Sequence, residues 1–180
     1  MNLYHYFQEV ADMLRSLFSR KSPRKETRLR HVLYLGSLVE RQAEAFYRHL
    51  AQQAYDKDVK ELYLSLSKDE AKHFSFLNNI LSGWKPLPAT KEDLEAMDAG
   101  ARLRNLFSSP PSPDATVEEV TEYAMNAEKK MVIFYLDFKN EFVYEWKKIK
   151  LWKMIEEEKS HVKKLSDMLS SLHERRLIAE

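Results

Sequence analysis

Two Glu-x-x-His pairs, each spaced alike from an earlier glutamate, constrain the fold of this chain more than any other feature. The pairs are Glu70/His73 and Glu158/His161. Glu40 and Glu128 each precede one pair by 30 residues, and the two sets are offset by 88 residues. A Glu and a His three positions apart project from the same side of a helix. Two such pairs and two single glutamates are the ligand inventory of a carboxylate-bridged two-metal site in a four-helix bundle.

Hydrophobic periodicity predicts the four helices that would carry these residues. The expected helices run from about 22 to 54, 58 to 82, 116 to 139, and from beyond Asn140 to past 172. Asp58 with Glu61, and Thr116 with Glu119, have the spacing of a capping box at a helix start. On each helix a charged residue interrupts an apolar stripe, which is costly in a core unless that residue is paired, protonated or bound to metal.

The spacing also places the acids at one depth in the bundle. Residues on two antiparallel helices lie level when they are equally far from the connecting turn. Glu40 and Glu70 have their midpoint at Tyr55, and Glu128 and Glu158 have theirs at Val143, close to the predicted break at Asn140. Four carboxylates and two neutral imidazoles would then balance two divalent ions. Mixed oxygen and nitrogen ligation suits iron or manganese, and zinc would also bind.

The chain is expected to have an N-terminal amphipathic helix at residues 1–21 and a bundle at 22–180, with a proline-rich crossover at about 83–115. The crossover would let the second and third helices run parallel. The N-terminal segment has an apolar face that begins at Leu3, Phe7 and Val10 and continues through Leu14 and Leu17. A membrane surface or partner could dock there. Packing on the bundle or on a second subunit is favoured, because the patch is short and contains the acids Glu9 and Asp12.

Composition excludes several other classes of protein. A length of 180 residues suits one domain, and a net charge of +1 gives no electrostatic case for nucleic acid. Cysteine is absent, which excludes disulfides, thiolate catalysis and iron–sulfur clusters within this chain. No apolar run reaches about 18 residues, so no transmembrane segment is expected. The N-terminus does not resemble a secretory signal, and a cytoplasmic location is expected.

The chain resembles the ferritin-like superfamily, and within it the rubrerythrin-related proteins. Four segments carry the resemblance: Glu40 to Tyr47 (ERQAEAFY), Asp69 to His73 (DEAKH), Glu128 to Tyr135 (EKKMVIFY) and Glu157 to His161 (EEKSH). The resemblance implies an all-α fold: a ferritin-like four-helix bundle with a long crossover between helices two and three. It implies two iron ions, with Glu70 and Glu158 bridging them. Glu40 and Glu128 would be the other carboxylate ligands, and His73 and His161 terminal ligands.

The chain also departs from the patterns of related proteins, and each departure changes what the resemblance implies. Met131 stands where rubrerythrins usually carry a further glutamate, which puts their redox-dependent ligand exchange in doubt. The usual Cys-rich electron-transfer domain is not in this chain, so an external electron donor protein is expected. Ala71 stands where bacterioferritins have their haem-binding methionine, so no haem is expected. A homodimer or higher oligomer is expected, because the apolar N-terminal segment needs a partner surface.

Functional hypotheses follow from the site. The first is a non-haem di-iron oxidoreductase, a rubrerythrin-like peroxidase reacting with peroxide or O2 in oxidative-stress defence. Alternatives are a ferroxidase in iron storage or traffic, an oxygenase, and a helical interaction module with a structural metal site. Tyr47 and Tyr135 would donate hydrogen bonds near the metals or relay electrons, or serve simply as core aromatics. Asp69 and Glu157 would accept hydrogen bonds from the ligand histidines, or be solvated helix charges.

Overall fold

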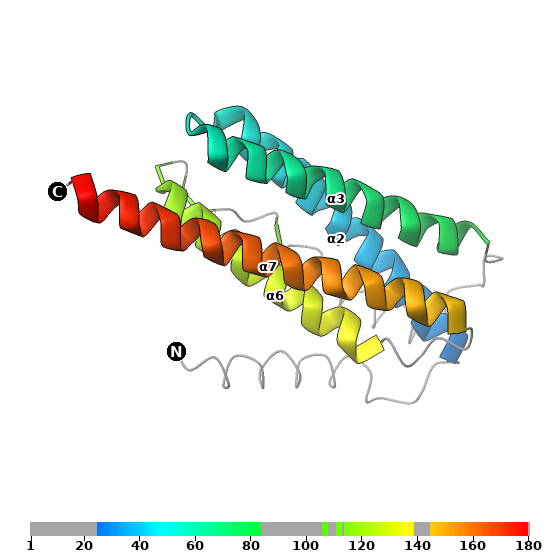
Figure 1. The fold of residues 1–180 in the computed structure, drawn as a ribbon. Coiled ribbons are helices and arrows are strands. Elements are labelled where there is room, and N and C mark those ends of the chain that lie inside the picture. The colour runs from blue at the N-terminus through cyan, green and yellow to red at the C-terminus, as the bar shows by residue number, and fades with distance from the viewer. Residues whose placement is uncertain (1–24, 84–105, 108–110, 113, 139–144, 180) are drawn as a thin grey trace.

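A computed structural model describes residues 25–83, 106–107, 111–112, 114–138 and 145–179 (Figure 1). Regular structure within these ranges consists of helices. They are α2 (Lys25–Gln53), α3 (Lys57–Ser82), α6 (Val117–Phe138) and α7 (Glu145–Ala179). The helix expected at residues 1–21, most of the crossover, and the break expected at Asn140 lie outside the described residues.

The helices form two antiparallel hairpins that pack side by side (Figure 1). Helices α2 and α3 make one hairpin and α6 and α7 the other, and α3 runs in the same direction as α6. A connection that joins two parallel helices must cross the length of the bundle, as the proline-rich segment between them was expected to do. The prediction of an all-α, ferritin-like four-helix bundle is confirmed.

Apolar stripes at helical spacing fill the space between the hairpins. Every helix contributes fully buried side chains to one core, among them Leu33, Leu66, Leu77, Phe134, Leu151, Ile155 and Leu165. Removing a side chain of this size from water contributes roughly 1.5–3 kcal/mol. The apolar layers on both sides of the acidic residues therefore provide the stability that lets the bundle hold charged groups at its centre.

The helix starts confirm one predicted cap and correct the other. At α6, the Thr116 backbone N–H donates to Glu119 Oε2 at 2.8 Å, and Glu119 N–H donates to Thr116 Oγ1 at 3.2 Å, as a capping box requires. At α3, the predicted cap at Asp58 is wrong. Asp56 has the extended backbone of a cap, and its Oδ1 accepts from the N–H groups of Asp58 and Val59. Asp58 already lies in the first helical turn.

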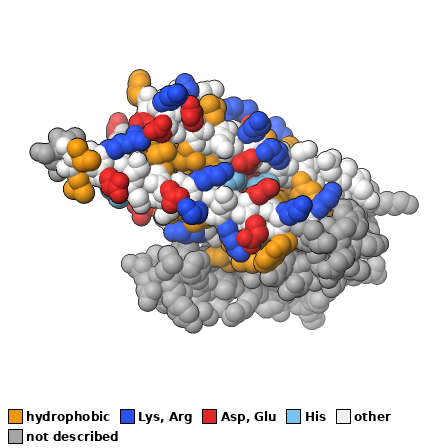
Figure 2. Space-filling model, in the orientation of Figure 1, with side chains coloured by type: hydrophobic (Ala, Val, Ile, Leu, Met, Phe, Trp, Pro, Cys, Tyr) orange, Lys and Arg blue, Asp and Glu red, His pale blue; other side chains and the backbone are white. Residues whose placement is uncertain are grey.

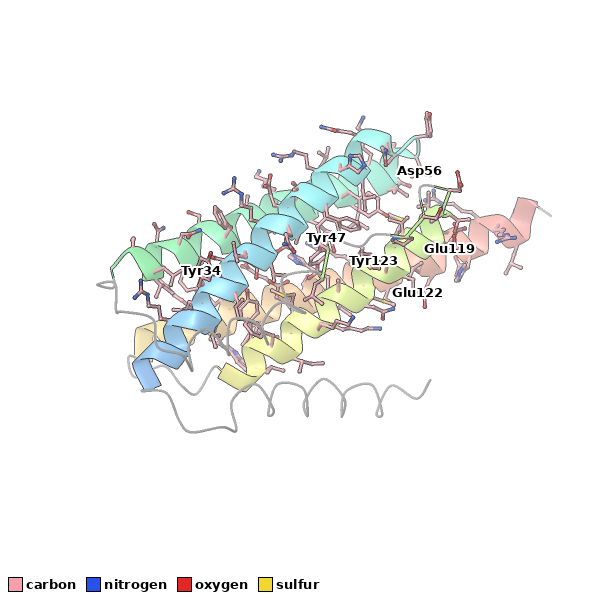
Figure 3. All side chains as sticks on the ribbon, turned by 180° about the vertical axis from the view of Figure 1, so that it is seen from behind. Tyr34, Tyr47, Asp56, Glu119, Glu122 and Tyr123 are labelled. Carbon is pink, nitrogen blue, oxygen red and sulfur yellow. The ribbon has the colours of Figure 1, made fainter. Side chains whose placement is uncertain are left out.

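One short piece of the crossover packs beside the centre of the bundle. Tyr123 donates its hydroxyl to the Leu106 carbonyl at 2.5 Å. The Phe107 ring lies 5.5 Å from the ring of Phe46 and 5.9 Å from that of Tyr47, measured between centroids. Tyr47 and Tyr123 face the interior from α2 and α6, which Figure 3 shows from behind. Leu106 and Phe107 thus cover the core on the side of Tyr47.

None of the described helices is long and apolar enough to cross a membrane.

Candidate metal centre

Side chains from all four helices meet at the centre of the bundle. Each of the six residues that the sequence singled out as metal ligands is at most 3% exposed. They are Glu40 on α2, Glu70 and His73 on α3, Glu128 on α6, and Glu158 and His161 on α7. Carboxylates are rarely buried this completely unless they are paired or bind a metal. The structure therefore brings all six predicted residues together.

The donor atoms fall into two groups that share two carboxylates. Glu40, His73, Glu70 and Glu158 offer ligand atoms that all lie within 4.8 Å of one another. A second group meets the same limit and consists of Glu128, His161, Glu70 and Glu158. Glu70 and Glu158 belong to both groups, so each can offer one oxygen to either side. Two adjacent sites with two common carboxylates match the arrangement of a carboxylate-bridged metal pair.

Both histidines turn the same ring nitrogen toward the carboxylates. His73 Nδ1 lies 2.8 Å from Glu158 Oε1 and 3.3 Å from Glu70 Oε2. His161 Nδ1 lies 2.8 Å from Glu70 Oε1 and 3.3 Å from Glu158 Oε2. The two imidazole rings stack with centroids 5.7 Å apart. Nδ1 is thus the nitrogen available to a metal in each half of the site.

The opposite ring nitrogens point to two acids that precede ligand glutamates. His73 Nε2 lies 2.8 Å from Glu157 Oε2, and His161 Nε2 lies 3.6 Å from Asp69 Oδ2. Each acid comes from the other hairpin, so each hairpin helps to orient its partner's histidine. A metal-bound histidine commonly donates its second N–H to a carboxylate, which fixes its tautomer and its orientation. The acceptor role expected for Glu157 agrees with this geometry, whereas Asp69 lies near His161 but beyond hydrogen-bond distance.

The two buried tyrosines also connect the hairpins. Tyr47 on α2 donates its hydroxyl to Glu128 Oε1 at 2.5 Å, and Tyr135 on α6 donates to Glu40 Oε1. Burial raises the pKa of both tyrosines, and the nearby Glu128 and Glu40 carboxylates raise it further. Each hydroxyl therefore keeps its proton and donates it to the neighbouring carboxylate. One oxygen of each terminal carboxylate is fixed in this way, and the other remains available.

Room for Tyr135 depends on Gly36, a glycine in the middle of α2 that the sequence analysis did not single out. A Cβ atom at Gly36 would lie 2.9 Å from the Tyr135 hydroxyl oxygen and 3.2 Å from Leu77 Cδ1. The signal was available: glycine lowers helix stability, so a glycine inside an apolar stripe indicates close packing. The residue 88 positions later is Ala124, which is also small and fully buried.

Electrostatics show how the cluster is balanced without a metal. Burial raises the pKa of Glu70, and it raises the pKa of Glu128 to about 7. For Glu158, burial acts in the same direction, but His73 and His161 together outweigh it and lower the pKa. Burial lowers the pKa of His73, yet the carboxylates of Glu158, Glu40 and Glu70 together outweigh that and raise it. The metal-free site therefore holds protons in place of positive metal charge.

Two close atoms in the cluster approach each other without hydrogen-bond geometry. His161 Nδ1 and Glu70 Oε1 are 2.8 Å apart, yet neither atom has a hydrogen-bond partner. Both carboxylate oxygens of Glu158 also have no hydrogen-bond partner. When the lone pairs of two atoms at this distance do not point at each other, both lone pairs can point at a common third position. Buried polar atoms without partners are costly, and a cation between them would satisfy them. The residues present thus fit a pair of divalent metal ions.

Glu44 lies one turn beyond Glu40 but takes no part in this cluster. Its carboxylate pairs with Arg48 at 2.8 Å on the helix surface, and it belongs to neither donor group. Met131, at the position where a further acid was considered, is 1% exposed and packs in the core.

Comparisons with known proteins give one positive finding. The model of the family described as rubrerythrin matches residues 32–169, a span that includes all six clustered residues. Searches of curated proteins and of solved structures found no match.

Proposed function

The chain belongs to the rubrerythrin family, and from that premise we propose that it is a di-iron protein that reduces hydrogen peroxide. The single observation that supports the proposal most strongly is the sharing of Glu70 and Glu158 by two groups of buried donor atoms. An isolated structural ion would need only one such group. Two adjacent groups fit two ions, and two ferrous ions together supply the two electrons that convert peroxide to water.

Each side chain has a role that follows from its contacts. Glu70 and Glu158 would bridge the two ions. Glu40 with His73 would complete one ion's ligands, and Glu128 with His161 would complete the other's. Six side chains shared by two ions leave coordination positions open for a small oxidant. Manganese or zinc could bind the same donors, and no residue is assigned to haem.

The surrounding residues orient the ligands and can transfer protons. Tyr47 and Tyr135 fix the terminal carboxylates through their hydroxyl donors. Glu157 holds the outer nitrogen of His73 and can accept its proton, and Asp69 lies near the outer nitrogen of His161. Reduction of peroxide to two water molecules consumes two protons. Glu157, whose side chain is 60% exposed while it contacts a buried imidazole, provides a connection between the site and solvent.

The reducing electrons would come from a separate protein. This chain contains no cysteine and so cannot hold a Cys-ligated iron of its own. We also propose that the protein acts in the cytoplasm as a dimer or higher oligomer. Tyr47 and Tyr135 are assigned as hydrogen-bond donors to the ligands. Their substitution by phenylalanine would distinguish this role from an electron relay.

The proposal is tested by loading the protein with Fe(II) without oxygen and mixing it rapidly with peroxide or with O2. The expected result is faster oxidation by peroxide, seen as a rise in near-ultraviolet absorbance, with iron retained by the protein. Faster oxidation by O2 with release or mineralisation of the iron would instead identify a ferroxidase. Stoichiometric zinc with no redox response would identify a structural metal site in an interaction module.

A matched pair of variants separates the site from the rest of the bundle. Glu70→Ala removes a residue shared by both donor groups and should abolish the rapid oxidation. Glu44→Ala removes a surface acid that pairs with Arg48 and should leave it unchanged. Equal loss in both variants would point to a general loss of fold rather than to the proposed chemistry.

A further inference from the structure

We propose that residues 3–19 of this chain dock as an amphipathic helix in an apolar groove along α6 and α7. The groove has a volume of about 280 Å3. Val132, Ile133 and Leu136 line it from α6, and Val162 lines it from α7. All four side chains are half-buried, which leaves part of each apolar surface open. Hydrophobic side chains on one face of the described residues are visible in Figure 2.

The other hairpin shows that the bundle does not require this groove. The positions 88 residues earlier are the counterparts of the lining residues, and most of them are polar or small. There Glu44 pairs with Arg48 at 2.8 Å, and the Arg41 guanidinium lies 5.6 Å from the centre of the Phe74 ring. Equivalent surfaces of two similar hairpins thus differ in chemistry, with charged groups on one and aliphatic groups on the other. The apolar surface needs its own explanation.

The composition of α6 also indicates a second covered side. Residues 131–136 read Met-Val-Ile-Phe-Tyr-Leu, so every direction around the helix is apolar over more than one turn. Met131, Phe134 and Tyr135 are buried in the bundle core. A helix that packs on one side alone has a polar opposite face, whereas one that is apolar all round is covered on more than one side. Val132, Ile133 and Leu136 therefore require a covering element.

The N-terminal segment has the length and the position to be that element. Residues 3–19 would make a helix about 25 Å long, with Leu3, Phe7, Val10, Leu14 and Leu17 on one face. Helix α2 begins at Lys25, at the same end of the bundle as the end of α6 and the start of α7 (Figure 1). The five residues between the segment and α2 can span roughly 17 Å. The segment can therefore turn back onto α6 without crossing the bundle.

Charged residues occur both in the groove and in the segment. Lys129 and Lys159 are among the groove-lining residues. The segment carries Glu9 and Asp12 near its centre, with the basic residues Arg20 and Lys21 at its end. Exposed ion pairs contribute little energy, so these charges add little to the docking. The apolar face would therefore supply the affinity of the docking.

Disulfide trapping tests the proposal directly, because the chain contains no native cysteine. Phe7→Cys, Val10→Cys and Leu14→Cys would each be combined with Val132→Cys in the full chain and oxidised with glutathione disulfide. The control pairs each with Glu44→Cys, the counterpart position on the other hairpin. We expect a disulfide within one chain for at least one Val132 pair, at roughly tenfold higher yield than in the control.

Other trapping results would overturn the proposal. A covalent dimer would mean that the segment of a second copy occupies the groove. Equal yields at Val132 and Glu44 would mean that the segment has no preferred surface. No disulfide with either partner would mean that the segment does not approach the groove.

Hydrogen exchange provides a second measurement that needs no cross-link. We expect backbone amides of residues 3–19 to be protected, and Ile133→Asp to speed their exchange about tenfold or more, while protection of α2 and α3 persists. Ala45→Asp, at the counterpart of Ile133, should leave the exchange unchanged. Unprotected amides in the unsubstituted protein, or protection insensitive to Ile133→Asp, would overturn the docking.

Discussion

At the scale of single residues, the site is held by contacts that cross between hairpins. Glu157 of α7 contacts His73 of α3, and Asp69 of α3 approaches His161 of α7. Tyr47 and Tyr135 make the same kind of crossing through their bonds to Glu128 and Glu40. The position of each ligand therefore depends on both hairpins. Loss of one such contact should loosen the metal without unfolding the bundle.

Glu157→Gln tests the role of these outer acids. The amide keeps the size of the side chain but removes the charge that holds the His73 ring. Outer partners of this kind typically change metal affinity by roughly 10–100-fold, and we expect a loss in that range. Competitive titration with a chromophoric chelator measures it. Glu156→Gln is the control, because Glu156 pairs with Lys159 at the surface. Equal losses in the two variants would contradict the assignment.

Gly36→Ala tests the packing around Tyr135. At an unhindered helix position, alanine is more favourable than glycine by about 1 kcal/mol. At Gly36 the new methyl group would lie 3.1 Å from Tyr135 Cε1 and closer to its hydroxyl oxygen, so crowding should outweigh that gain. We expect a net loss of about 1 kcal/mol in the free energy of unfolding, measured with urea.

Gly83→Ala is the matched control, because its nearest neighbour would lie at an ordinary contact distance of 3.6 Å. That substitution should change stability by less than about 0.5 kcal/mol. A gain in stability for Gly36→Ala would show that Tyr135 can move without cost.

The pH dependence of stability should differ between metal-free and metal-loaded protein. Without metal, burial raises the pKa of Glu128 to about 7, so folding favours its protonated form, and stability falls as pH rises from about 4.5 to 7. The raised pKa of His73 and of His161 gives stability that is complete below about 6.5 and is lost as pH rises further. Metal ions bind only the deprotonated ligands.

Melting temperatures with and without saturating zinc, a redox-inert probe, should therefore diverge between about pH 5 and 8. We expect the stabilisation by zinc to grow as pH rises. A stabilisation that stays constant across this range would mean that the site holds no displaceable protons.

At the scale of elements, the helix starts decide where each hairpin turns. Asp56→Ala removes the acceptor of two backbone N–H groups at the start of α3 and an ion pair with Arg175. Loss of such a cap lowers the free energy of unfolding by about 1 kcal/mol. Asp58→Ala removes only the exposed partner of Arg175 and should cost less than about 0.5 kcal/mol. Urea denaturation of both variants measures the difference, and a larger loss at Asp58 would contradict the position of the cap.

The helices themselves were predictable because each carries its own pattern of apolar residues. Thr116 and Glu119 cap α6 through contacts three residues apart, which sequence alone can indicate. The start of α3 was misplaced by two residues for a physical reason. Asp56 and Asp58 are both suitable caps, and backbone conformation chooses between them. The groove on α6 and α7 was not predicted, because it forms only where two helices meet.

At the scale of the whole molecule, the 88-residue offset relates two hairpins that make one site. Spacing along the chain predicted that six residues would meet, because the distance of a residue from its turn fixes its depth in the bundle. It did not predict which tyrosine contacts which glutamate, or that Asp69 faces His161 rather than His73. Those pairings depend on how the two hairpins pack together, which local patterns do not specify.

The proposed function requires one chain to bind two metal ions between its hairpins. Anaerobic titration of the metal-free protein with Fe(II), with binding measured at equilibrium, tests this most directly. We expect two ions per chain, with both lost in Glu158→Ala because Glu158 belongs to both donor groups. Glu40→Ala and Glu128→Ala each remove a donor from one group only, and each should retain one ion. One ion per chain in the unsubstituted protein, or two ions retained in Glu158→Ala, would contradict the claim.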